Sequence, residues 1–164
     1  GKGTNFRIYL PQHAATSDAT ARTDHAEDQP RDLTGIGTVL LVEDEDAVRL
    51  FSARALRNKG YKVLEARSGE AALELARSFR PHVVLLDIGL QGMDGYEVAR
   101  RLRNEQAAGE NLCLLAVTGY GDAEARACCD AAGFDRHLVK PVPPDALCEL
   151  LAEIGRAHKF QEVT

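Results

Sequence analysis

Residues 83 to 87 read Val-Val-Leu-Leu-Asp, an uninterrupted apolar run that ends in a carboxylate. A continuous run of this length, rich in branched side chains, is typical of a strand buried on both faces of a parallel sheet. A strand with one face in solvent alternates apolar and polar residues instead. The run therefore predicts a sheet covered by helices on both sides, with Asp87 at the carboxyl end of a strand.

The segments around this run repeat its arrangement. Short apolar runs alternate with longer segments whose apolar residues recur every three or four positions, as in a helix with one buried face. The expected strands are 38–42, 61–65, 82–86, 112–117 and 134–139, and the expected helices are 47–59, 69–79, 96–105, 122–132 and 144–156. Five strand–helix units in succession predict an α/β fold, with a doubly wound, five-stranded parallel sheet.

Residues at the ends of these segments support the division. Ser68 is suited to an N-cap, Gly60 and Gly133 follow their helices, and Pro144 stands in a first turn. We interpret Asp46 as the cap of the first helix. That helix is expected to bury an apolar face made of Val48, Phe51, Ala55 and Leu56.

Composition excludes several classes of function. The 164 residues include 20 Lys and Arg against 25 Asp and Glu, with no block of basic residues that favours nucleic acid or an anionic membrane. No apolar run approaches the roughly 18–20 residues of a membrane helix. The four cysteines form neither a CxxC pair nor a disulfide framework. We therefore expect reduced thiols, a cytoplasmic location, no nucleic acid and no direct membrane contact.

The N-terminal part of the chain differs in composition. Residues 12–36 are polar, with few large apolar side chains, and are interpreted as a linker that forms no packed core. Residues 1–11 have the pattern of a lone β-strand that ends at a proline. The predicted organisation is thus a mostly unstructured N-terminal extension, a domain over 37–158 and a C-terminal tail over 159–164.

Charged and polar side chains follow four of the expected strands. Glu43 and Asp44 follow the first, Asp87 ends the third, Thr118 ends the fourth and Lys140 follows the fifth. Open α/β sheets bind ligands outside the carboxyl ends of their strands, at the point where the strand order switches. These side chains are therefore expected to meet at one edge of the sheet.

This set of side chains suits phosphoryl transfer to a carboxylate. Neighbouring carboxylates raise each other's pKa unless a cation compensates, and hard oxygen ligands with room for water suit Mg²⁺. A transferring phosphoryl group needs its oxygens neutralised, which a metal ion, an ammonium and a hydroxyl can do. Asp87 is the best candidate for a nucleophile that forms an acyl phosphate, with Lys140 and Thr118 contacting the phosphoryl group.

From about residue 37 to residue 157, the sequence resembles a response-regulator receiver domain of bacterial two-component systems. The resemblance implies a flavodoxin-like fold and a reaction in which Asp87 takes a phosphoryl group from a kinase phosphohistidine. It also implies that phosphorylation switches a protein-interaction surface near the fourth helix and fifth strand. The matching motifs are residues 39–45, 83–88 with 92–97, 116–119 and 138–141.

The resemblance further implies a ligand set for Mg²⁺ or Mn²⁺. Asp44, Asp87 and the backbone carbonyl of Gly89 would hold the ion, and Glu43 would contribute through water. Glu43 stands where the family frequently has Asp, and its longer arm still suits an outer-sphere role. Gln91 replaces a frequent Pro in the loop after Asp87.

Two switch residues and a cis peptide are implied in the same way. Thr118 would move to bond the phosphoryl group, and the peptide between Lys140 and Pro141 would be cis. His137 occupies the position where the family often has a Tyr or Phe that repacks when the Thr moves. The alternative for His137 is an ordinary exposed histidine at a strand end.

The first eleven residues are similar to the closing turn and strand of the ATP-binding domain of sensor histidine kinases. This second resemblance implies the C-terminal receiver of a hybrid histidine kinase. Its partners would be a histidine kinase domain in the same parent chain and a histidine phosphotransfer protein. A chance strand-like segment is the alternative. Because the chain stops soon after the fifth expected helix, we expect no output domain to follow it.

Two other functions stay open from the sequence. A Mg²⁺-dependent, phosphatase-like hydrolase uses a similar Asp and Lys, although such enzymes usually carry a second acid where this chain has Gly89. A binding-only pseudo-receiver is the third possibility. Whether the protein counts as an enzyme is left open, since a receiver catalyses only its own aspartyl phosphorylation and dephosphorylation.

Overall fold

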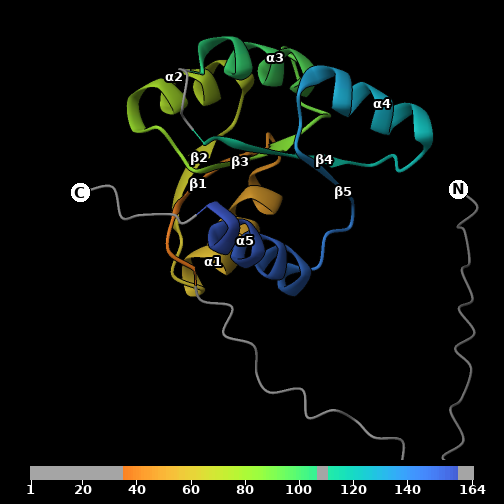
Figure 1. The fold of residues 1–164 in the computed structure, drawn as a ribbon. Helices are drawn as coiled ribbons and strands as arrows, with labels where there is room; N and C mark the ends of the chain where they lie inside the picture. Colours follow the sequence, from red (N-terminus) through yellow and green to blue (C-terminus); the bar gives the residue numbers. More distant parts are fainter. Residues whose placement is uncertain (1–34, 107–110, 159–164) are drawn as a thin grey trace, which may run out of the picture. The chain divides into compact units, whose positions relative to one another are not determined.

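The structure is a computed structural model that describes residues 35–106 and 111–158. The predicted strand over 1–11, nearly all of the linker and the tail over 159–164 lie outside the described residues. Ten elements alternate along the chain (Figure 1). They are β1 (Thr38–Val42), α1 (Asp46–Asn58), β2 (Lys62–Ala66), α2 (Gly69–Phe79), β3 (Val83–Asp87), α3 (Gly95–Glu105), β4 (Cys113–Thr118), α4 (Ala123–Ala132), β5 (Arg136–Val139) and α5 (Pro144–His158).

The five strands form one parallel sheet in the order β2-β1-β3-β4-β5. This confirms the predicted doubly wound fold, with bounds that differ from the predicted ones by two residues at most. The chain moves outward from β1 to β2, then crosses back to β3 and continues to the other side. The strand order therefore switches between β1 and β3, which places the expected binding edge where these two strands end.

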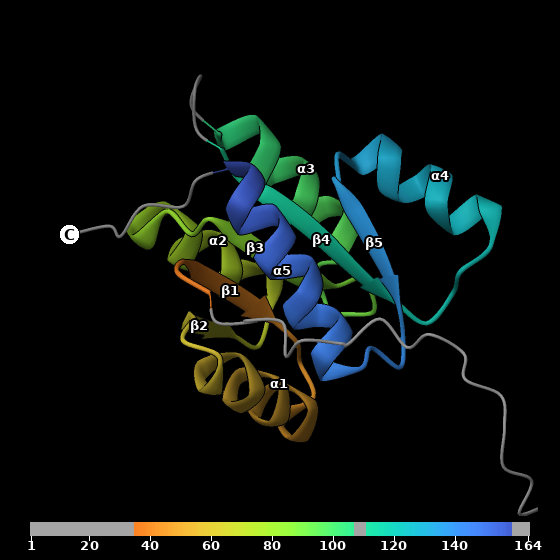
Figure 2. The same ribbon diagram turned by 60° about the horizontal axis from the view of Figure 1, so that its bottom comes forward.

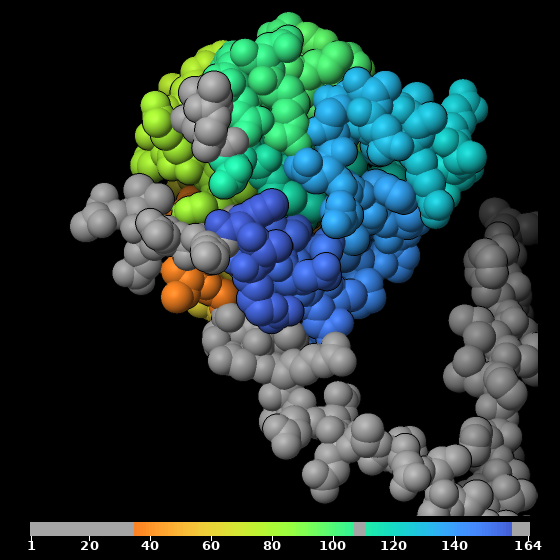
Figure 3. All heavy atoms as spheres, in the orientation of Figure 1, coloured from red at the N-terminus to blue at the C-terminus, as the bar shows by residue number. Residues whose placement is uncertain are grey.

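Helices cover both faces of the sheet. Helices α1 and α5 lie on one face, and α2, α3 and α4 lie on the other (Figures 1 and 2). The atoms of α2, α3 and α4 form one continuous surface (Figure 3). Every residue of β1 and β3 is buried, whereas the outer strands β2 and β5 mix buried or half-buried residues with exposed ones. This is why the apolar runs are unbroken in the central strands.

The predicted helix ends are mostly confirmed. The hydroxyl of Ser68 accepts a hydrogen bond from the backbone N–H of Ala71, Gly133 ends α4 with a φ of 91°, and Pro144 begins α5. The interpretation of Asp46 as a cap is wrong. Residue 45 precedes α1 without a capping side-chain hydrogen bond, and Asp46 is the first helical residue, paired with Arg49.

The predicted apolar face of α1 is also wrong in part. Leu56 is buried as expected, but Phe51 is 66% exposed and Val48 is 37% exposed. The buried residues of the helix are Arg49, Ala53 and Leu56. The helix is therefore rotated relative to the expected stripe, and a guanidinium with several polar partners is buried at a position that the pattern assigned to solvent.

Candidate functional site

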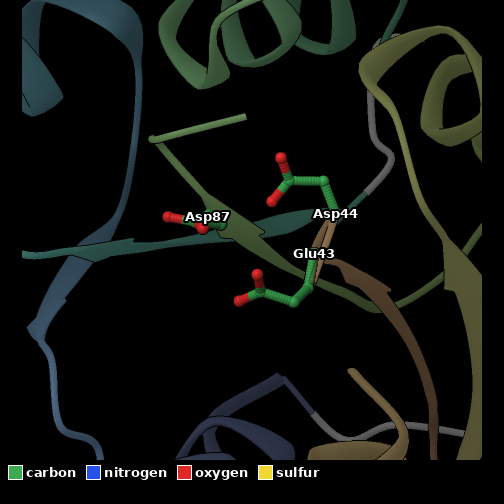
Figure 4. A group of neighbouring side chains, drawn as sticks. All are labelled: Glu43, Asp44 and Asp87. Carbon is green, nitrogen blue, oxygen red and sulfur yellow. The ribbon is translucent and has the colours of Figure 1, made fainter. Parts of the chain in front are cut away.

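Three carboxylates gather where β1 and β3 end. Glu43 and Asp44 follow β1, and Asp87 is the last residue of β3. One ligand oxygen from each lies within 4.8 Å of the others. In Figure 4 the carboxylates of Asp44 and Glu43 lie above and below that of Asp87. Glu43 and Asp87 are buried and Asp44 is half-buried, so part of this negative charge is held away from bulk water.

Lys140 joins the cluster from the end of β5, an outer strand of the sheet. It follows β5, and its Nζ lies 2.7 Å from Asp87 Oδ2 and 3.2 Å from Glu43 Oε2. Its backbone N–H donates to the carbonyl of Thr118 at 2.8 Å, which ties the end of β5 to the end of β4. The peptide between Lys140 and Pro141 is cis, as the resemblance implied.

The protonation of this cluster follows from its surroundings. Burial raises the pKa of Glu43, and the charge of Asp87 raises it further, against the lowering effect of hydrogen bonds from Lys140 and the Glu45 N–H. Burial alone would lower the pKa of Lys140. The hydrogen bonds and charges of Asp87 and Glu43 outweigh it, so that this pKa is raised. Lys140 is thus a cation at neutral pH, and it contacts two of the three carboxylates, those of Asp87 and Glu43.

Backbone N–H groups of the loop after β3 hold two of the carboxylates. The N–H of Gly89 donates to Asp87 Oδ1 at 3.0 Å, and that of Gln91 donates to Asp44 Oδ2 at 3.3 Å. The loop returns sharply into α3 at Gly95, where a Cβ would lie 2.7 Å from the backbone of Asp87 and Ile88. A glycine is therefore needed here for the close approach of the helix start to the site.

Thr118 and His137 lie on neighbouring strands. Thr118 is buried, and its hydroxyl oxygen accepts a hydrogen bond from the N–H of Tyr120 at 3.0 Å. His137 is half-buried and pairs in register with Ala116, two residues before Thr118. Because side chains alternate along a strand, Thr118 and His137 point to the same face of the sheet, the face that α4 covers.

Sequence reasoning missed one polar residue that contacts this site. Arg49 is buried in the first turn of α1, where it donates to the backbone carbonyls of Glu43 and Asp44. A single Arg in an amphipathic helix is normally assigned to the exposed face. The signal that could have found it is its place three to six residues after four consecutive acids, within reach of the loop they form.

A groove opens beside the cluster, between α1 and α5. It is lined by Val48 and Phe51 of α1, Leu147 of α5, and Asp87 and Lys140 of the cluster. Of these lining residues, Phe51 is 66% exposed. Within the described part of the chain, no helix is both long enough and apolar enough to cross a membrane.

Comparison with known proteins gives concordant matches. Residues 39–152 match the family model described as "Response regulator receiver domain". The chain is 41% identical over 133 residues to Sensor kinase CckA of Brucella abortus, covering 77% of this chain and 14% of that protein. It is 39% identical over 124 residues to Virulence sensor protein BvgS of Bordetella pertussis, covering 73% of this chain and 10% of that protein.

A solved structure matches over the same domain. The chemotaxis response regulator CheY4 of Vibrio cholerae superposes with a TM-score of 0.67 at 28% sequence identity, over 73% of this chain and 98% of that one. The two sensor proteins are far longer than this chain, which spans less than a fifth of either. The matches thus concern one domain of those proteins.

Proposed function

Since the chain belongs to the response regulator receiver domain family of two-component systems, we propose that Asp87 is its phosphoacceptor. In this proposal Asp87 takes a phosphoryl group from a kinase phosphohistidine in a Mg²⁺-dependent reaction. The observation that carries the proposal is the contact of Lys140 Nζ with Asp87, 2.7 Å apart, beside two further carboxylates. A nucleophile and the charges that its transition state needs thus lie together.

The donor set fits a small divalent cation. Three carboxylates gather around one ammonium that contacts two of them, and carboxylate oxygens are the ligands that Mg²⁺ prefers. We propose that Asp44, Asp87 and the backbone carbonyl of Gly89 hold the ion, with Glu43 acting through water. Mn²⁺ suits the same oxygens. When bound, the ion supplies positive charge to the phosphoryl oxygens during transfer.

The chain's own groups divide the remaining tasks. An oxygen of Asp87 attacks phosphorus, the phosphorus–nitrogen bond breaks, and its electron pair stays on the imidazole of the donor. Lys140 holds Asp87 before the attack and neutralises charge on the phosphoryl oxygens during it. Attack by water on the acyl phosphate later returns the free carboxylate and inorganic phosphate.

We propose that the signal leaves through Thr118 and His137. A phosphoryl group on Asp87 offers the hydroxyl of Thr118 a stronger, charged acceptor than its present local contact with the Tyr120 N–H. Movement of Thr118 frees space on the face that His137 shares. Tyr120 and Val139 are already exposed on this side of the molecule, at 75% and 43%, and belong to the surface that would change.

The proposed donor is a histidine kinase domain, in the same parent chain or through a histidine phosphotransfer protein. Similarity to a sensor kinase and a virulence sensor protein supports the first arrangement. The donor imidazole must reach Asp87, so its domain must rest on the rim around the site. Val48 and Phe51 line the groove beside the site, are exposed, and offer that domain an apolar contact. The four free cysteines are in line with a reducing, cytoplasmic location.

A variant pair within one loop tests the proposal. The protein is incubated with a small acyl phosphate and Mg²⁺, or with a cognate phosphorylated kinase, and its mass is measured. Asp87→Asn is expected to lose the phosphoryl adduct. Asp94→Asn is the matched control, because Asp94 is an acid seven residues away that caps α3 and Asn caps equally well.

Each outcome has a definite meaning. An adduct that forms on the wild type, disappears with a chelator and persists in Asp94→Asn supports the proposal. An adduct retained by Asp87→Asn, or its absence from the wild type with both donors, contradicts it. Turnover of a phosphomonoester by the wild type would favour a hydrolase instead.

A further inference from the structure

Arg49 is a buried cation directly behind the acidic loop. Its side chain is 7% exposed, and within residues 35–106 and 111–158 it is the one Lys or Arg that is buried. A buried charge is costly unless it is paired and hydrogen-bonded. The partners of Arg49 therefore indicate why its guanidinium is buried at this position.

Two of these partners are the backbone carbonyls of the proposed metal-binding residues. The last paired residue of β1 is Val42, so the carbonyls of Glu43 and Asp44 lie where the chain has left the sheet. Arg49 Nη1 donates to the first at 2.8 Å and reaches the second at 3.5 Å. The guanidinium thus fixes the backbone from which both carboxylates project.

The other partners are carboxylates that do not belong to the metal site. Arg49 pairs with Asp46 in the first turn of α1, and its Nε lies 3.7 Å from Glu65 Oε2 on β2. Glu65 is itself held by Arg57, 2.8 Å away. One side chain therefore ties the acidic loop to a helix and to a neighbouring strand, both of which are packed on the core.

We propose that Arg49 is a positioning residue for the magnesium site. Its planar guanidinium holds the loop so that the carboxylates of Glu43 and Asp44 lie beside that of Asp87 before any ion binds. Binding of the ion then does not have to order these carboxylates, which strengthens binding. This inference rests on the proposed function of the site. It adds a residue that contacts neither the ion nor the phosphoryl group.

If Arg49 acted only through its charge, its removal would change the Mg²⁺ affinity in the opposite direction. A positive charge close to a cation site repels the cation, so removal of that charge alone would tighten Mg²⁺ binding. Removal of a positioning residue loosens the ligands and weakens binding. The sign of the change in Mg²⁺ affinity therefore distinguishes the two roles.

The experiment compares three variants by titrating each with Mg²⁺ and following backbone amide chemical shifts. Arg49→Met is expected to bind Mg²⁺ about 10-fold more weakly or worse. Arg49→Lys keeps the charge but loses the planar guanidinium, and is expected to fall between Arg49→Met and the wild type. Arg103→Met should bind as the wild type does.

Arg103 is a suitable control because its contacts are of the same kind. It donates at 2.8 Å to the carbonyls of Leu112 and Gly133 and pairs with Asp135, but at the opposite edge of the sheet. Loss of affinity in both arginine variants would assign the effect to general destabilisation and overturn the proposal. Unchanged or tighter binding in Arg49→Met, or wild-type affinity in Arg49→Lys, would overturn it as well.

A second measurement needs no metal. The N–H of Glu45 donates to Glu43, and that of Gln91 donates to Asp44. Amide hydrogen exchange at residues 45 and 91 is expected to accelerate in both Arg49 variants and not in Arg103→Met. Unchanged exchange would refute the positioning role. If the wild type failed to bind Mg²⁺, the proposed function would fail while exchange still decided the role of Arg49; if Arg49→Met failed to fold, Arg49→Lys would decide it.

Discussion

The two sides of the sheet at which its parallel strands begin and end use the same chemical groups for different purposes. We call the side where the strands begin the amino edge and the side where they end the carboxyl edge. At the amino edge, Arg103 donates to two carbonyls and pairs with Asp135, whose carboxylate also accepts the N–H of Leu114 at 2.7 Å. One cation meets one carboxylate there. At the carboxyl edge three carboxylates gather, and Lys140 contacts the two that are buried, Asp87 and Glu43.

The difference shows how one fold separates stability from function. Charges that are balanced within the protein stabilise it and leave nothing for a ligand to do. Negative charges that are left in surplus cost stability and attract a cation. Arg49 combines both uses, because it balances charge in the loop while holding the surplus carboxylates in place.

The largest expected effect comes from removing the ammonium that contacts Asp87. Lys140→Met should slow the appearance of the phosphoryl adduct on Asp87 about 100-fold or more, because a preorganised charge on the transferring group is lost. The rate is measured by mass spectrometry with a small acyl phosphate and Mg²⁺. Lys62→Met, at an exposed position on β2, is the control. A rate within a few-fold of the wild type would exclude a role for Lys140 in transfer.

The next effect concerns the amino edge and should fall on stability alone. Arg103→Met is expected to lower the free energy of unfolding by about 2 kcal/mol. It removes the donor to two carbonyls and the ion-pair partner of Asp135 at a partly exposed position. Urea denaturation measures the loss. Arg100→Met, on the same helix, should change stability far less because Arg100 makes only surface contacts with Glu97. Equal losses of unfolding free energy in both variants would contradict the interpretation that the balanced charges of Arg103 and Asp135 stabilise the protein.

The contrast between the edges was only partly predictable from the sequence. The unbroken run before Asp87 predicts a buried strand, and the rule for parallel sheets then brings Asp44 and Lys140 to the same edge. The rotation of α1 was not predictable, because a hydrophobic pattern assigns Arg49 to solvent. Its partners lie on the preceding loop and on β2, so that only the pairing of strands brings them within reach.

A smaller effect concerns how the stability of the protein depends on pH, and it comes from a thiol at the amino edge. Burial, with the charge of Asp135 and a hydrogen bond to it, raises the pKa of Cys113 at the start of β4 to about 12. The folded state thus favours the neutral thiol, whereas an unfolded thiol ionises near its ordinary pKa of about 9. Stability is therefore full below about pH 9 and is lost as the pH rises toward the folded value, by about 1 kcal/mol at pH 10.

Urea denaturation between pH 7 and pH 10.5 measures this loss. Burial also raises the pKa of Cys129 and Cys148, which should add to the slope. Cys113→Ala should reduce the slope. A slope that Cys113→Ala leaves unchanged would show that this thiol does not contribute.

The smallest effect has the opposite sign and tests the surplus charge directly. The pKa of Glu43 is raised, so its neutral form is favoured in the folded state, and ionisation costs stability at pH values above the folded pKa. Glu43→Gln should therefore stabilise the metal-free protein at pH 7, by about 1 kcal/mol or less. At pH 4, below the ordinary pKa, the gain should vanish. Thermal unfolding with a chelator measures both.

Addition of Mg²⁺ should reverse the order of the two proteins. A ligand that binds only the folded state stabilises it, so the wild type should gain more from Mg²⁺ than Glu43→Gln does. Glu45→Gln, at the neighbouring exposed position, should behave as the wild type in both conditions. If Glu43→Gln were less stable than the wild type without metal, the contact of Glu43 with Lys140 would outweigh the repulsion from Asp87, and the carboxyl edge would be balanced like the amino edge.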